Sequence, residues 1–169
     1  MFKKEHIEKL RAFSHERWPY QLGPTHGVEH WDRVAKFAQI LYVEGADMDV
    51  MQAFAYIHDA ERRDNDYDID HGKRASKLID VIRHEELSFL NDEQIAKLKR
   101  ACELHNVERR TGDLTIDICF DADRMDLPRV GIMPLPQKMA TKQGAEIVLS
   151  PDYLPLYAEL NPPFKSLFL

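Results

Sequence analysis

Disulfide-forming cysteines, long apolar runs and an excess of basic residues are all missing from this chain of 169 residues. Its two cysteines, Cys102 and Cys119, form no disulfide framework and match no thiolate metal motif, so we expect them to be small buried apolar residues. No apolar run is long enough to span a bilayer, and the first ten residues are too polar for a signal peptide, so we expect a cytoplasmic protein without a membrane partner.

The net charge of the chain indicates which kinds of ligand it can bind. A formal net charge of −6 argues against a general nucleic-acid-binding surface, for which a basic stripe is expected. It leaves a nucleotide substrate open, because a bound cation can supply local positive charge. With 44% apolar residues, and with neither glycine nor proline in excess, the chain is expected to fold as one domain over residues 1–169 around a single core.

Apolar residues recur mainly at helical spacing, which predicts an all-α protein. The one ambiguous stretch is 115–127, where β-branched Thr115, Ile116 and Ile118 favour a strand although the apolar spacing suits a helix. Glycine, proline or acidic clusters predict loops over 18–27 and 61–70, and a proline-rich tail follows residue 149. The predicted helices cover residues 3–17, 28–44, 47 or 49 to 60, 71–84, 91 or 92 to 105, and 137–149.

Polar side chains of the kind that bind metals interrupt the apolar faces of these helices. Helix periodicity turns one or two of them inward on each of five segments. A single inward histidine is more often a core residue with a hydrogen-bond partner, but buried carboxylates are costly without a counter-charge, and a shared cation removes that cost. Imidazole with carboxylate suits Mn, Fe, Co, Ni, Zn or Mg. The inward residues are His30, His58, Asp59, His71, His105 and Asp123.

The order of these residues resembles the HD-domain superfamily of metal-dependent phosphohydrolases, which has a His, an adjacent His-Asp pair and a distant Asp. The resemblance rests on HGVEHWDRVAKFA around His30, AYIHDAER around His58 and Asp59, and FDADRMDLPRVGI around Asp123. The further run RRDNDYDIDHGKRAS resembles an uncharacterised bacterial subgroup of that superfamily.

The resemblance implies an HD-domain helical bundle of five core helices with peripheral helices. Its core would cover about 26–132, with a C-terminal extension over 133–169. It implies that His30, His58, Asp59 and Asp123 bind one divalent metal ion. Some HD enzymes hold two ions through additional histidines, and His71 and His105 stand in the order that a second site requires. The alternative for these two is a hydrogen bond to substrate phosphate or to a metal ligand.

A phosphohydrolase site also needs groups that orient water and neutralise phosphate oxygens. We expect Asp59 to hold the attacking water, with Glu61 as the candidate general base or acid. Several nucleotide-cleaving HD families place a Glu where this chain has Arg62, so their substrate is not carried over. The candidate substrate-binding cations are Arg62, Arg63, Arg33 and Lys73, and the alternative for each is a solvated surface residue.

The expected function is therefore hydrolysis of a small-molecule phosphomonoester or phosphodiester, with nucleotides as one class of substrate. Three alternatives remain: an HD-type nuclease for single-stranded nucleic acid, a di-iron oxygenase, and an HD fold that only binds. The proline-rich tail is expected either to wrap across the core or to dock on a second subunit in a homodimer.

Overall fold

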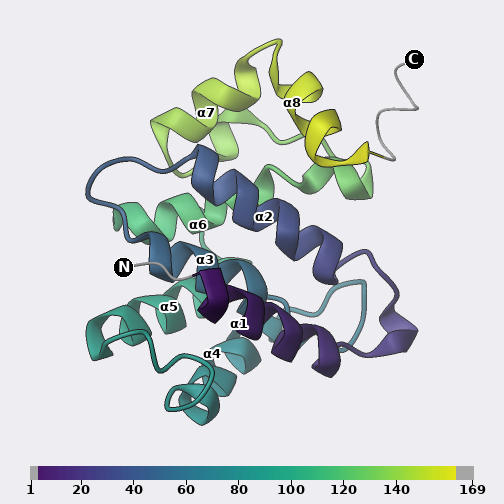
Figure 1. Cartoon of the computed structure of the whole chain (residues 1–169). Helices are drawn as coiled ribbons and strands as arrows, with labels where there is room; N and C mark the ends of the chain where they lie inside the picture. The colour runs from purple at the N-terminus through teal and green to yellow at the C-terminus, as the bar shows by residue number, and fades with distance from the viewer. Residues whose placement is uncertain (1–3, 163–169) are drawn as a thin grey trace.

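The computed structural model describes residues 4–162, and within that range it contains helices and no strand (Figure 1). This confirms the prediction of an all-α fold. Three 3-10 helices, at Tyr20–Leu22, Leu127–Val130 and Pro136–Lys138, lie in the described connections. The α-helices of the described part are α1 (Lys4–Arg17), α2 (Val28–Ile40), α3 (Met48–Ile57), α4 (His71–Ile82), α5 (Asp92–Leu104), α6 (Leu114–Arg124), α7 (Lys142–Leu149) and α8 (Tyr153–Leu160).

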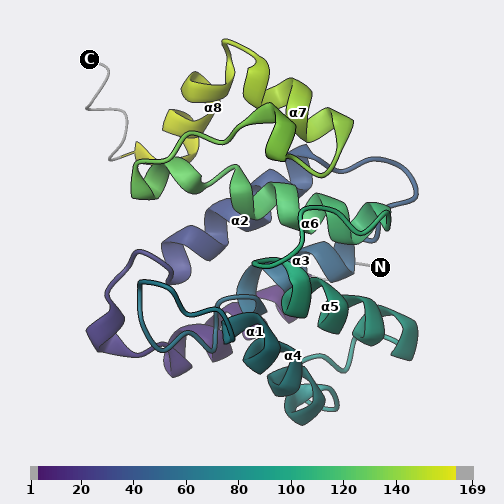
Figure 2. The same ribbon diagram turned by 180° about the vertical axis from the view of Figure 1, so that it is seen from behind.

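Helix α3 lies at the centre of the bundle. Every residue from Val50 to Ile57 is buried, which requires partners on all sides of this apolar helix. Those partners are α1, α2, α5 and α6, while α4 packs against α5 on the outside (Figures 1 and 2). The C-terminal end of α3 is therefore enclosed by neighbouring helices, a position in which polar side chains need specific partners.

Side-chain caps fix the beginnings of several helices. Asn91 and Gln94 form a reciprocal capping box at the start of α5, and Asp47 accepts a hydrogen bond from the Val50 amide at the start of α3. The ambiguous stretch is helical as α6, where Asp113 accepts a hydrogen bond from the Ile116 amide. The cap and the packing of α6 against α2 and α3 outweigh the strand preference of its β-branched residues.

The predicted helix ends were too late in four places, and one start was too early. Helix α2 ends at Ile40 rather than 44, α3 at residue 57 rather than 60, α4 at residue 82 rather than 84, and α5 at residue 104 rather than 105. Helix α7 begins at residue 142 rather than 137, because Pro136 begins a separate 3-10 helix. The early end of α3 matters most, since it leaves His58 and Asp59 in the turn that follows the helix.

The tail contains a helix that sequence periodicity missed. Helix α8 carries Tyr153 and Tyr157, which are both buried. The Tyr153 hydroxyl donates to the Met125 carbonyl at 2.6 Å, and the Tyr157 ring stacks on Phe37 of α2 with centroids 6.3 Å apart. The tail through residue 162 therefore covers α2 and the end of α6, while residues 163–169 lie outside the described part.

None of the described helices combines the length and the apolar character that crossing a membrane requires.

Replacing Tyr157 by alanine should lower the free energy of unfolding by about 3 kcal/mol, because it removes a fully buried ring between α8 and α2. Chemical denaturation measures this change. Tyr67→Ala is the matched control, since that ring is 86% exposed. Equal midpoints for the two variants would contradict the packing of α8 on α2.

Candidate metal centre

Six side chains from five segments meet beside the C-terminal end of α3, and all lie at or next to helix ends. His30 is in the first turn of α2, His71 is the first residue of α4, and Asp123 is in the last turn of α6. His58 and Asp59 follow α3 directly, and His105 follows α5. Within each of three overlapping groups, one candidate ligand atom from every residue lies within 4.8 Å of the others. The structure thus brings all six predicted metal-binding residues together.

One half of this cluster contains His30, His58 and Asp123. The Nε2 atoms of His30 and His58 are 3.2 Å apart. The Oδ1 atom of Asp123 lies 3.3 Å from Nε2 of His30 and 3.7 Å from Nε2 of His58. Two ligand atoms on one transition-metal ion are roughly 3 to 3.6 Å apart, given bonds of about 2.0–2.2 Å. Two of the three separations lie within this range and the third slightly exceeds it, so the spacing is close to that around a single shared ion.

The other half contains His71 and His105, whose Nε2 atoms are 2.9 Å apart. Asp59 joins the two halves. Its Oδ1 atom lies 3.0 Å from Nε2 of His71 and 3.7 Å from Nε2 of His105. Its Oδ2 atom lies 3.7 Å from Nε2 of His30 and 3.8 Å from Nε2 of His58. Each oxygen of this one carboxylate thus faces one pair of imidazoles.

Hydrogen bonds at Nδ1 determine which nitrogen of each ring faces the centre. Nδ1 of His105 lies 2.7 Å from the Cys102 carbonyl, and Nδ1 of His58 lies 3.1 Å from the Phe54 carbonyl. Nδ1 of His71 faces the Asp68 carbonyl. Because a carbonyl can only accept, Nδ1 carries the hydrogen in these rings, and Nε2 presents a lone pair in the neutral form.

The lone pairs of neighbouring Nε2 atoms indicate whether a cation fits between the histidine rings. Two neutral Nε2 atoms at about 3 Å repel each other unless a proton or a metal ion lies between them. The cluster contains two such pairs and the two carboxylates Asp59 and Asp123. Histidines that bind metals typically donate their other N–H to a carbonyl or carboxylate, as these do. The described residues therefore fit a cation, and their arrangement provides room for two.

The electrostatics agree with this geometry. Burial alone would lower the pKa of His58, but the charge of Asp59 and the contacts with Asp123 raise that pKa above its ordinary value. Burial would raise the pKa of Asp59, yet His58 and the other surrounding rings hold it well below its ordinary range. The pKa of Asp123 is likewise held well below its usual range, against the effect of burial, by His30 and His58. The carboxylates stay ionised and the site attracts positive charge.

Helix ends and a close helix contact support the cluster. The carbonyl ends of α3, α5 and α6 and the amide ends of α2 and α4 meet at this region, so helix ends of both polarities surround the cluster. A Cβ atom on Gly72 would lie 2.4 Å from the Cys102 carbonyl, so only glycine permits this approach of α4 to α5. That approach is what brings His71 to His105.

The sequence did not predict the buried ion pair that lies behind His30. Asp126 is fully buried, and its Oδ2 atom accepts from Nδ1 of His30 at 2.7 Å. The Arg33 guanidinium donates to both oxygens of the same carboxylate, at 2.6 and 3.0 Å. Asp126 thus orients the His30 ring. Its position three residues after Asp123, one helical turn further on, was the signal that could have identified it.

His26 and Arg129 extend the polar network on the side of Asp59. Nδ1 of His26 lies 3.2 Å from Oδ2 of Asp59 and 3.2 Å from a terminal nitrogen of Arg129. Burial lowers the pKa of His26, so the ring is neutral near pH 7. Arg129 also donates to the carbonyls of Thr25 and Asp126. Arg129 is thus a further cation near the cluster, and the sequence did not predict it.

Of the predicted substrate-binding cations, only Arg62 contacts the cluster. It is buried, its Nη1 atom lies 3.6 Å from Oδ1 of Asp59, and it donates to the carbonyls of Asp64 and Asp66. Arg33 is bound by Asp126 as described above. Lys73 lies on the outer face of α4, where it is exposed and pairs with Asp70 at 3.3 Å.

Within residues 4–162, Glu61 and Arg63 form no hydrogen bond or ion pair with the six cluster residues. The carboxylate of Glu61 accepts from Arg17 at 2.7 Å. Arg63 is exposed, and its side chain forms no hydrogen bond or ion pair within residues 4–162. The assignments of Glu61 as a base and of Arg63 as a substrate ligand remain predictions.

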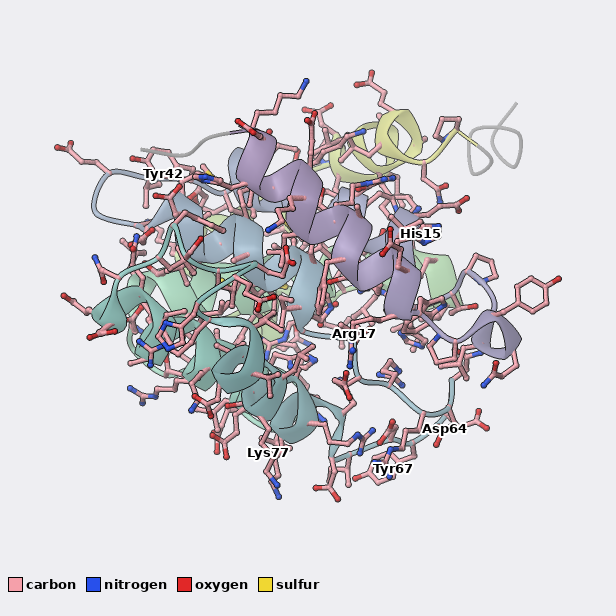
Figure 3. The ribbon with its side chains drawn as sticks, turned by 60° about the horizontal axis from the view of Figure 1, so that its bottom comes forward. His15, Arg17, Tyr42, Asp64, Tyr67 and Lys77 are labelled. Atoms are coloured by element: carbon pink, nitrogen blue, oxygen red, sulfur yellow. The ribbon has the colours of Figure 1, made fainter. Side chains whose placement is uncertain are left out.

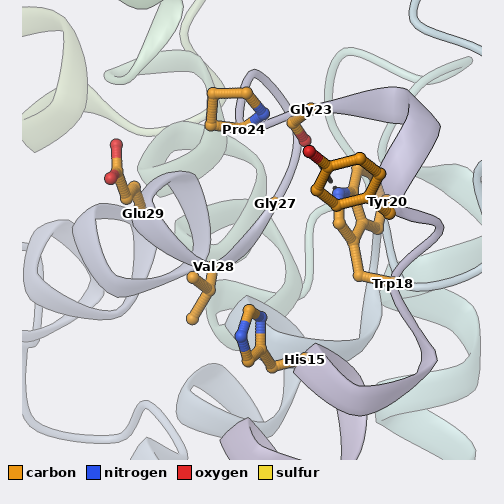
Figure 4. A pocket seen from close by; sticks show the side chains of 8 residues that line it. All are labelled: His15, Trp18, Tyr20, Gly23, Pro24, Gly27, Val28 and Glu29. Atoms are coloured by element: carbon orange, nitrogen blue, oxygen red, sulfur yellow. Dashed lines mark hydrogen bonds between the residues drawn. The ribbon is translucent and has the colours of Figure 1, made fainter.

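An apolar pocket of about 310 Å³ lies beside the segment that leads to His30 (Figure 4). The Trp18 indole forms part of its wall, donates to the Gly23 carbonyl at 2.8 Å, and meets Trp31 edge-on. A Cβ atom on Gly27 would lie 3.2 Å from the indole nitrogen. The Trp18 indole therefore stabilises the connection between α1 and His30.

Comparison with known proteins gives no match: no family model, no curated protein and no solved structure matches this chain.

Metal analysis of protein purified without chelator should find two transition-metal ions per chain when the medium supplies them. His71→Ala/His105→Ala should retain one ion, because it leaves the half that contains His30, His58 and Asp123. His84→Ala is the control, since that side chain is exposed on the protein surface. A double variant with the same metal content as wild type would refute binding in the second half.

Asp126→Asn should weaken metal binding by about 10- to 100-fold, because it weakens the hydrogen bond that orients His30. Competition with a chromogenic chelator measures the affinity, and circular dichroism checks the fold. Asp32→Asn is the control, since Asp32 pairs with Arg11 at 2.7 Å. Unchanged affinity in a folded Asp126→Asn protein would show that His30 needs no such support.

Proposed function

We propose that this protein is a metal-dependent phosphohydrolase of the HD-domain superfamily, acting on a small-molecule phosphate ester. The observation that carries the proposal is Asp59, whose two oxygens each face a pair of imidazoles with inward Nε2 atoms. The resemblance of the chain around His30, His58 and Asp123 to the HD pattern supports the same assignment.

The donor set defines what the centre can do. His30, His58, Asp123 and Asp59 would hold one divalent ion, and His71 and His105 would hold a second with the other oxygen of Asp59. Such ions supply Lewis-acid stabilisation of a phosphoryl group and acidify bound water. Imidazole and carboxylate ligands allow Mn, Fe, Co, Ni, Zn or Mg.

Two guanidinium groups, that of buried Arg62 and that of partly buried Arg129, are suited to hold the substrate phosphate. Arg62 faces Asp59 from one side, and Arg129 contacts His26 on the other. Backbone carbonyls already orient both groups, so little side-chain entropy is lost when they bind phosphate oxygens. Arg62 and Arg129 therefore stabilise negative charge that develops on the phosphoryl oxygens.

Proton transfer needs a group that is neutral near pH 7 and close to the reacting water. His26 is our candidate, because burial lowers its pKa and its Nδ1 atom donates to Asp59, which leaves Nε2 as the nitrogen that accepts a proton. Glu61, the candidate from the sequence, is engaged by Arg17 in the described structure. We therefore place the general base at His26, with Glu61 as the alternative that a Glu61→Gln variant tests.

A di-iron oxygenase is the second candidate. Four imidazoles around one carboxylate would also suit two irons, and the side chains alone do not select between hydrolysis and oxygen chemistry. Metal content distinguishes the two: an oxygenase requires two irons and consumes oxygen, whereas a phosphohydrolase is active with a redox-inert ion.

The proposal predicts hydrolysis of 4-nitrophenyl phosphate by protein supplied with Mn²⁺ or Ni²⁺. Asp59→Ala should abolish the activity, because both halves of the cluster lose their shared carboxylate. Arg62→Ala should lower kcat/KM by roughly 100-fold through lost charge stabilisation. Release of 4-nitrophenol measures both effects, and a panel of nucleotides and phosphodiesters then identifies the substrate class.

Arg100→Ala is the matched arginine control, since its side chain is exposed on α5. Metal-loaded wild-type protein without activity on any phosphate ester would overturn the proposal. Activity that Asp59→Ala retains would show that the reaction occurs elsewhere.

A further inference from the structure

A second, larger cavity, which is wide open to solvent, lies between α1 and α4 beside the 61–70 loop. Its volume is about 650 Å³, which is within the range of small-molecule sites. Figure 3 looks onto this face of the molecule, with Arg17 at the end of α1 and Lys77 on α4. We call it the basic cavity; its lining residues are Phe13, Arg17, Glu61, Arg63, Arg74, Lys77, Leu78, Val81, Ile82 and Glu85.

The charge of this cavity is opposite to that of the whole protein. Four of its lining side chains are basic and two are acidic, whereas the chain carries a formal net charge of −6. A local excess of positive charge on an acidic protein attracts anions and is screened by salt.

Not all of the basic groups are already paired. Arg17 donates to Glu61, and Arg74 donates to Asp68 and to the Glu61 carbonyl. The side chains of Arg63 and Lys77 form no ion pair or hydrogen bond within the described range, and both are exposed. Two cations are therefore free to bind a doubly charged anion.

The remaining wall of the cavity is apolar. Phe13, Leu78 and Ile82 contribute carbon surface, and Val81 is 78% exposed although it is aliphatic. The Arg17 guanidinium lies over the Phe13 ring, 5.4 Å from its centroid. An inorganic anion would use only the cations, whereas a ligand with an apolar body would also cover this surface.

The basic cavity and the metal cluster use different side chains of one loop. Arg62 faces the cluster while Arg63, the next residue, lines the cavity. Asp68 connects the two sides, because its carboxylate accepts from Arg74 and its carbonyl faces Nδ1 of His71. None of the six candidate metal ligands lines the cavity, although Glu61, the alternative base, does.

We propose that the basic cavity binds an organic phosphate, with Arg63 and Lys77 on the phosphate group and the apolar wall against its carbon body. Of the two acidic side chains that line the cavity, Glu85 forms no ion pair among the described residues, and it is placed to accept a hydrogen bond from the ligand. This site does not depend on the reaction at the metal centre.

Nitrogen-15 NMR of the zinc-loaded full chain tests the proposal, with phenylphosphonate as a non-hydrolysable probe. Backbone amides of Arg63, Lys77 and Val81 should shift in a saturable manner. Phenylphosphonate should bind more tightly than inorganic phosphate, because only the former covers the apolar wall, and phenol should not bind. Arg63→Ala/Lys77→Ala should weaken binding at these amides by about tenfold or more.

Arg100→Ala/Lys138→Ala is the matched control, since it removes the same two kinds of exposed cation elsewhere. It should leave the titration unchanged. Because the cavity residues are read separately, binding at the metal cluster does not imitate the result. The proposal is overturned if the cavity amides do not move at millimolar phenylphosphonate, or if they move equally in wild type and in Arg63→Ala/Lys77→Ala.

Discussion

The carboxylate of Asp59 lies at the centre of the bundle with only 3% of the residue exposed, and both of its oxygens face imidazole rings. An ionised carboxylate at this depth is stable only if surrounding groups supply positive charge or hydrogen bonds. That requirement links the positions of four helices. His30, His58, His71 and His105 each come from a different helix end, so a shift of any one helix would remove a partner from Asp59.

The residues that surround Asp59 lie at the ends of helices rather than in their interiors. Residues at helix ends leave the regular hydrogen-bond pattern, so their side chains and backbone groups are available to a site. The early end of α3 frees His58 and Asp59, and Gly72 allows α4 to approach α5. Behind this first layer, Asp126 holds His30 and is itself held by Arg33. Rigid support of this kind keeps a binding geometry in place before any ligand arrives.

The 61–70 loop extends this organisation to the surface. It contributes Arg62 to the metal cluster, and Arg63 immediately after it lines the basic cavity. The Asp68 carboxylate accepts from Arg74, and its backbone carbonyl faces His71. Both of these residues belong to α4, so two contacts attach the loop to that helix. The candidate metal centre and the proposed organic-phosphate site therefore share one connection between α3 and α4.

Sequence periodicity was sufficient for the all-α fold and for the six inward residues, because a polar side chain on an apolar face is visible in the chain itself. It missed α8, whose short apolar stretch contains Pro155, and it overextended α3 through His58 and Asp59. Chain order also selected Arg33 and Lys73 as substrate ligands, although one is bound by Asp126 and the other lies on the outer surface. Local spacing does not show which partner a charged side chain meets in the folded protein.

The sequence by itself determined which residues are turned toward the core, since helical spacing is a local property. Only the tertiary structure decided that each oxygen of Asp59 faces one imidazole pair, and that Asp126 and His26 join them. Those contacts join residues up to 96 positions apart in the chain, and they depend on how helix ends pack rather than on any single helix.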